Sequence, residues 1–190
     1  MANWASTSYR IEGNESDLQE MFNLCKAFVN DERPVMEENA SKEWEGNIVL
    51  ALGIDKGSSC LRGFIQDFSL DDGVLSIEAE EAWGATDFRH LIEAHYDNMK
   101  VYFILEEEGG EVYATNDKDG RFFDYRFLVD SSVDGADEWE YFSTKEQALS
   151  YIAKKMDVAE ITEEEIDAWN EEHEEDDDNY INFHEYSLVD

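Results

Sequence analysis

Positive charge, proline, cysteine and long apolar runs are all scarce in this sequence of 190 residues. Only 14 Lys and Arg stand against 48 Asp and Glu, and the formal net charge of −34 excludes direct electrostatic binding of nucleic acid or of an anionic membrane surface. No stretch approaches the roughly 18 apolar residues of a transmembrane helix. Two cysteines, Cys25 and Cys60, are too few for a disulfide framework, so we expect both to be reduced residues of the core.

The first nine residues also lack a basic segment followed by an apolar run. We therefore expect no secretory signal, and a cytoplasmic location for the chain.

Apolar and aromatic residues are nevertheless plentiful, at 42% and 13% of the sequence, which is enough to build a core at this length. Their spacing predicts strands and helices along the whole chain. The strands are expected at 6–12, 61–69, 74–83, 100–107, 111–115 and 122–129, and the helices at 16–30, 45–52, from Thr86 onward, at 144–155 and from Thr162 onward. The final segment, 180–189, also has strand-like residues after an acidic run.

The order strand, helix, hairpin, helix, strand is typical of a split β-α-β arrangement. The predicted fold class is therefore α+β: a ferredoxin-like antiparallel sheet with helices packed on one face, extended by extra strands and an acidic C-terminal helix. We expect a ferredoxin-like domain over 1–157. Residues 158–190 are expected to form an acidic helix and terminal segment, either packed on that domain or flexible. Within the hairpin, a bulge is expected at 81–83.

Three short motifs resemble a known family: Met1–Trp4, a strand ending at Ile11–Gly13, and Glu81–Trp83 just before a helix. Over roughly residues 1–130 the chain is similar to the YubB-type ferredoxin-like domain family. The resemblance implies the fold and a bacterial or mobile-element setting. It transfers no catalytic residue.

Metal and cofactor sites are not expected. The two cysteines and four histidines have no zinc-ligand spacing. The segment 117–120 resembles the middle of a calcium loop, but Arg126 stands where the bidentate glutamate belongs, so we interpret the segment as a hairpin turn.

Catalytic residues are not expected either. Adjacent acids such as Glu80 and Glu81 point to opposite faces of a strand, so we interpret these acids as solvated surface. We therefore expect that the chain is not an enzyme. The weaker alternative is a hydrolase that uses surface carboxylates.

The acidity itself has two interpretations, and the first is that the charge serves only solubility. We predict a non-enzymatic, protein-binding domain. The alternative is a nucleic-acid mimic that occupies a basic DNA- or RNA-binding protein. A third possibility is that 180–186 adds a strand to another chain. The acids expected to bind the partner lie on strands and on the last helix: Glu78, Glu80, Glu106, Glu163, Glu164, Glu165, Asp167, Glu171 and Glu172.

Overall fold

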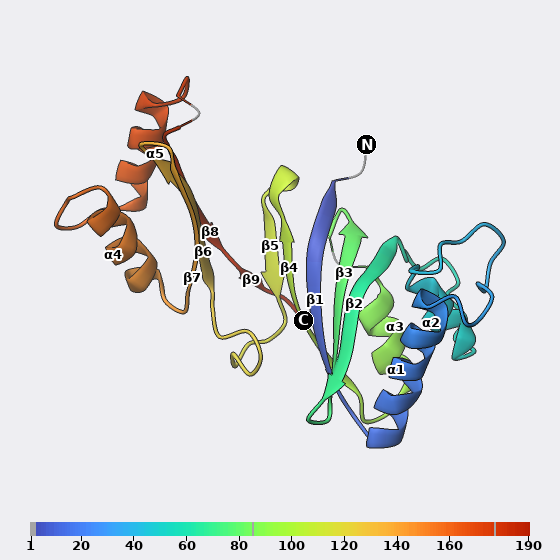
Figure 1. Cartoon of the computed structure of the whole chain (residues 1–190). Helices are drawn as coiled ribbons and strands as arrows, with labels where there is room; N and C mark the ends of the chain where they lie inside the picture. Colours follow the sequence, from blue (N-terminus) through green and yellow to red (C-terminus); the bar gives the residue numbers. More distant parts are fainter. Residues whose placement is uncertain (1–2, 85, 177) are drawn as a thin grey trace. The chain divides into compact units, whose positions relative to one another are not determined.

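The computed structural model describes residues 3–84, 86–176 and 178–190. They belong to two compact units, one formed by 1–117 with the last two residues and the other by 118–188 (Figure 1). Five α-helices and two mainly antiparallel sheets lie in the described part of the chain, so the architecture is mixed α+β, as predicted. The division differs from the one expected at residue 157, because 118–157 supply the sheet on which the later helix packs.

The described part of the first unit contains five strands and three α-helices. In chain order they are β1 (Trp4–Glu12), α1 (Glu15–Val29), α2 (Gly46–Ala51), β2 (Gly63–Asp71), β3 (Val74–Ala82), α3 (Phe88–His95), β4 (Lys100–Glu107), the 3₁₀ turn η1 (Glu108–Gly110) and β5 (Val112–Thr115). These strands follow the order β2-β3-β1-β4-β5 in the sheet, and the short strand β9 (Ser187–Leu188) belongs to the second unit. Both neighbours of β1 run antiparallel to it.

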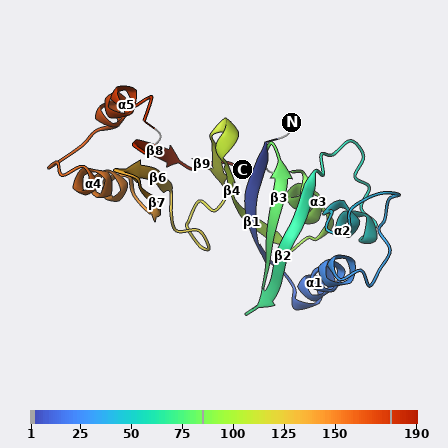
Figure 2. The same ribbon diagram turned by 45° about the horizontal axis from the view of Figure 1, so that its top comes forward.

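Alternation along β1 separates the two faces of this sheet. Ala5, Thr7, Tyr9 and Ile11 are buried, while the residues between them are partly or fully exposed. The buried face packs against α1, α2 and α3, which lie on the same side of the sheet in both views (Figure 1, Figure 2). Each large apolar side chain buried in this way stabilises the fold by about 1.5–3 kcal/mol. The helices thus leave the second face of β1, β3 and β4 for other contacts.

The second unit is a three-stranded sheet with two helices. Its elements are β6 (Phe127–Val133), β7 (Ala136–Phe142), α4 (Lys145–Lys155), α5 (Glu163–Glu172) and β8 (Tyr180–Glu185). The sheet order is β7-β6-β8, and both pairs are antiparallel. Side chains of both helices and of β6 and β8 form one apolar cluster, which includes Val129, Ile152, Ile166 and Ile181. Capping boxes start both helices, formed by Thr144 and Gln147 in α4 and by Thr162 and Glu165 in α5.

The strand predicted at 122–129 is wrong, since β6 begins only at Phe127. The guanidinium of Arg126 donates hydrogen bonds to the carbonyl oxygens of Phe123 and Tyr125, both at 2.8 Å. Gly120, with φ of 65°, bends the chain further. The expected hairpin turn at 117–120 is therefore part of an irregular segment, and the hairpin of this unit, β6 to β7, turns instead at Asp134 and Gly135.

Two smaller predictions in the first unit are also corrected. The irregularity in the β2–β3 hairpin lies between Ile65 and Asp67, and not at 81–83. Asp87, not Thr86, is the N-cap of α3. The hydroxyl of Thr86 instead accepts a hydrogen bond from the backbone N–H of Phe88 at 3.2 Å, and it donates one to the carboxylate of Glu81.

Candidate functional site

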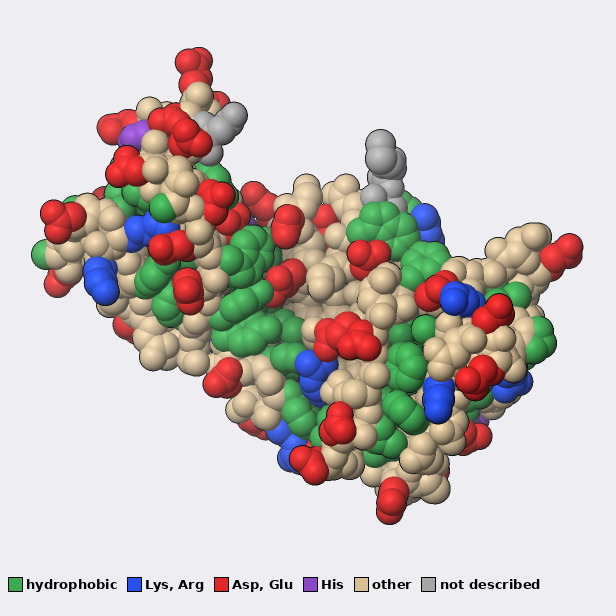
Figure 3. All heavy atoms as spheres, viewed as in Figure 1, with side chains coloured by type: hydrophobic (Ala, Val, Ile, Leu, Met, Phe, Trp, Pro, Cys, Tyr) green, Lys and Arg blue, Asp and Glu red, His purple; other side chains and the backbone are tan. Residues whose placement is uncertain are grey.

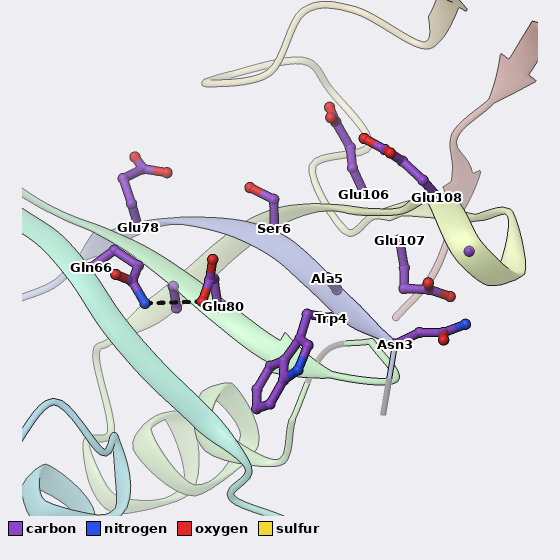
Figure 4. Close-up of a pocket in the computed structure, with 12 residues that line it drawn as sticks. Asn3, Trp4, Ala5, Ser6, Gln66, Glu78, Glu80, Glu106, Glu107 and Glu108 are labelled. Carbon is purple, nitrogen blue, oxygen red and sulfur yellow. Dashed lines mark hydrogen bonds between the residues drawn. The ribbon is translucent and has the colours of Figure 1, made fainter. Parts of the chain in front are cut away.

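The second face of the first unit's sheet carries a hollow of about 520 Å³. Ser6 of β1 is the cross-strand partner of Glu80 on β3 and of Glu106 on β4. Because directly opposed residues share a face, with Cβ atoms about 4.5–5.5 Å apart, the two carboxylates flank the serine in one row. The sequence-predicted acids of the two strands are therefore brought together, as Figure 4 shows.

Five carboxylates line this hollow, which we call the acidic hollow: Glu78, Glu80, Glu106, Glu107 and Glu108. Arg10 pairs with Glu78 at 2.8 Å, and the hydroxyl of Ser8 donates to the same carboxylate. The amide of Gln66 donates to Glu80 at 3.3 Å (Figure 4). Adjacent β-strands fix Glu78, Glu80 and Glu106 on one face at short spacing, so the site attracts positive charge and repels anions.

Aromatic side chains lie at the same end of the sheet. Trp4 lines the acidic hollow and is 45% exposed, with its ring centroid 5.6 Å from that of Phe64. Trp83 is 57% exposed and holds the guanidinium of Arg62 4.4 Å above its ring. Its φ of 64° is an outlier for a bulky residue, and it marks the end of β3. Exposed tryptophans can contact the aliphatic stems and cationic heads of basic side chains.

The other acids that were predicted to bind the partner belong to the second unit. All six lie exposed on α5. Glu163 pairs with Lys145, and Glu165 completes the capping box with Thr162. Asp167 and Glu171 line a separate, shallow hollow on the same helix. The visible surface as a whole carries many more acidic than basic side chains (Figure 3).

Two of the buried acids form a pair that the sequence analysis did not identify. Glu45, just before α2, is 1% exposed, and Glu81 of β3 is 0% exposed. The interpretation of Glu81 as solvated surface is therefore wrong. The signal was present in the alternation of β3: Leu75, Ile77 and Ala79 face inward, and the next inward position is 81. For Glu45 no local pattern signals burial.

Glu81 receives several hydrogen bonds inside the core. Its Oε1 accepts from the hydroxyl of Tyr9 at 2.7 Å and from the hydroxyl of Thr86 at 2.9 Å. Burial raises the pKa of Tyr9 well above its usual value of 10, and the two nearby glutamates raise that pKa further. Tyr9 is therefore a neutral hydrogen-bond donor at any ordinary pH.

Within 3–84, 86–176 and 178–190, no group of three or more His, Cys, Asp and Glu side chains is arranged to hold a metal ion. Cys25 is buried, which raises the pKa of its thiol to about 12, whereas Cys60 is exposed, contrary to the core position expected for it.

None of the helices in the described part of the chain has the length and apolar character needed to cross a membrane. In comparisons with known proteins, the chain matches no family model, no curated protein and no solved structure.

Proposed function

We propose that this chain is a protein-binding domain, and that its acidic hollow receives a basic segment of the partner protein. The observation that carries the proposal is the row formed by Glu80, Ser6 and Glu106 on three adjacent strands. The role is binding rather than catalysis, and the partner is a protein rather than nucleic acid or membrane.

The chemistry of the acidic hollow favours Lys and Arg side chains. Carboxylates accept charge-assisted hydrogen bonds from ammonium and guanidinium groups, and two close carboxylates can engage both edges of one guanidinium. Trp4 supplies an apolar surface beside them, on which the stem of a basic side chain can pack. The hydroxyl of Ser6 adds a small polar group between the acids.

The charge of the whole chain supports this function. A net charge of −34 steers a basic partner toward the surface and raises the association rate, mainly at low salt. Strand positions keep the carboxylates fixed before the partner arrives, so little side-chain entropy is lost on binding.

The second candidate function is mimicry of a nucleic-acid backbone, with a basic DNA- or RNA-binding protein as the partner. It is favoured by α5, on which six exposed carboxylates occur within ten residues. A helix fixes their spacing, as the duplex fixes that of phosphates. The weaker alternative of hydrolysis by surface carboxylates has no comparable support.

The proposal also covers the fold and the family of the first unit. The order β1-α1-α2-β2-β3-α3-β4, with β1 between β3 and β4 in the sheet, supports a ferredoxin-like path in which α2 is an additional helix, and a relationship to the YubB-type family. The acidic helix α5 would then be an appended binding element, in a bacterial or mobile-element protein of the cytoplasm.

Two variants of equal charge test which surface binds. Glu80→Gln with Glu108→Gln removes two negative charges from the acidic hollow and spares the Arg10–Glu78 ion pair, while Glu164→Gln with Glu171→Gln removes two negative charges from α5. Each variant is titrated calorimetrically with an extended peptide of alternating basic and polar residues, at low and at high salt.

We expect the hollow variant to lose about tenfold in affinity, equivalent to ~1.4 kcal/mol, and the α5 variant to bind as the unmodified protein does. A loss confined to the α5 variant would contradict the hollow and favour mimicry. Equal losses in both would mean that only overall charge attracts the peptide.

A further inference from the structure

The feature that carries a further inference is the buried acid pair, Glu45 and Glu81. Gly63 is the cross-strand partner of Glu81, and it has no side chain to place beside that residue. The carboxyl group of Glu45 fills the vacant space instead: an ideal Cβ on Gly63 would lie 2.3 Å from its Oε2. The two carboxyl groups therefore occupy the positions of opposed side chains on one face of the sheet, where Cβ atoms lie about 4.5–5.5 Å apart.

The hydrogen bonds of this pair are incomplete. Both carboxyl oxygens of Glu45 and Oε2 of Glu81 are buried without a partner. No ion pair of the described residues involves either acid. Two unpaired negative charges at such depth would cost far more free energy than the fold can supply, whereas a neutral acid can donate to a carboxylate.

The groups around the pair fit a single remaining charge. Tyr9 from β1 and Thr86, just before α3, donate to Glu81, so Glu81 is suited to be the ionised member. Arg89 from α3 is the nearby cation; it lies 4.8 Å above the ring of Phe103 and its charge acts on Tyr9. Burial raises the pKa of Glu45 well above its usual 4.5, and the charge of Glu81 raises it further.

We propose that Glu45 and Glu81 share one proton, and that this proton holds the segment of Glu45 and α2 against the β2–β3 edge. The same segment is also held by Ile48 and Val49 of α2, which are buried in the core, and by three hydrogen bonds to β2 and the residues before it. The N–H of Glu45 donates to the carbonyl of Gly63 at 3.1 Å, and the N–H of Ile65 donates to the carbonyl of Glu43 at 2.8 Å. The indole of Trp44 donates to the carbonyl of Leu61. Loss of the proton places a second charge beside Glu81 and weakens this docking.

The sign of the pH dependence follows from proton counting. In the unfolded chain Glu45 ionises near its usual pKa of 4.5, whereas the folded protein keeps the proton to a higher pH. Between the two pKa values the folded state binds more protons, so raising the pH favours unfolding. The stabilisation is complete below the unfolded pKa and disappears as the pH rises through the raised folded pKa.

The test uses the full chain with Cys60 replaced by Ser, so that the buried Cys25 alone reports opening of the first unit. Thiol labelling is measured across the pH range for the parent protein, for Glu45→Gln and for Glu38→Gln. Gln at 45 cannot ionise but can donate to Glu81. Glu38 is exposed, so its variant removes the same charge from the surface. Rates are compared at each pH, which cancels the ionisation of the thiol.

We expect the parent and Glu38→Gln to label faster than Glu45→Gln, by a factor that grows up to about tenfold for each pH unit within the window. Parallel profiles for all three proteins would overturn the shared proton. If Glu45→Gln does not fold, the parent protein is examined by infrared spectroscopy near neutral pH. We expect the band of a protonated carboxylic acid to be present, and its absence would overturn the proposal. Stabilisation by one equivalent of Ca²⁺ or Mn²⁺ that requires Glu45 would also overturn it, since the pair would then hold a metal.

Discussion

The carboxyl group of Glu45 lies where a side chain at Gly63 would be, with Oε2 only 2.3 Å from the ideal Cβ position. The glycine is thus required by a neighbour and not by its own backbone conformation. It allows an acid from the loop before α2 to enter the core beside Glu81. Exchange of one hydrogen for a methyl group at this position should therefore displace the acid.

Gly63→Ala is expected to destabilise the first unit by roughly 2–4 kcal/mol, because overpacking and a displaced buried polar group act together. The measurement is unfolding by denaturant, with labelling of Cys25 as the readout. Gly13→Ala is the matched control: its Cβ would lie 3.4 Å from Met99, an ordinary contact. Addition of Glu45→Ala to Gly63→Ala should restore part of the loss by freeing space, and a further loss in the double variant would contradict this account.

The two cysteines should differ sharply in reactivity. Cys60 is exposed, whereas burial raises the pKa of the Cys25 thiol to about 12 and closes it to reagents. In native protein at mildly alkaline pH we expect one thiol to react quickly with an alkylating reagent. The second should react only after denaturant is added, as followed by mass spectrometry. Fast modification of both thiols in native protein would contradict the packing described for α1.

The end of α4 offers a stabilising substitution in the second unit. Asp157 follows the last turn with φ of 56°, and the N–H of Val158 donates to the carbonyl of Ala153 at 2.9 Å. Glycine adopts this conformation without strain, and its introduction also removes a negative charge from the C-terminal end of the helix dipole. Asp157→Gly should stabilise the unit by about 0.5–1 kcal/mol in thermal unfolding.

Asp157→Ala is the control, because it removes the same charge but keeps the Cβ atom. We expect it to be less stable than Asp157→Gly. Equal stability of the two variants would mean that charge alone, and not backbone conformation, governs this position.

Periodicity predicted much of the secondary structure. The predicted strand over 100–107 matches β4, and the predicted helix over 16–30 matches α1 within one residue at each end. Both elements bury one regular stripe or face, so their sequence pattern reports their environment directly. The six acids that were predicted on the last helix are exposed on α5, because a helix with a thin apolar stripe presents most of its surface to water.

The pattern did not reveal β7. Its sequence alternates acids with aromatics such as Trp139 and Tyr141, and six of its seven residues are exposed. Acidic residues have low strand propensity, so local preference argues against a strand there. Pairing with β6 across the turn at Asp134 and Gly135 provides the hydrogen bonds that the local sequence does not.

Composition and short-range periodicity were enough to predict the α+β class, the excess of negative charge and the lack of zinc-ligand spacing among the thiols and histidines. Which acids lie next to each other depends instead on strand register and packing. Glu80 and Glu106 are 26 positions apart, and they flank Ser6 through strand register. Glu45 and Glu81 are brought together by the space that Gly63 leaves open. Such proximity arises from long-range pairing and packing, which no local pattern encodes.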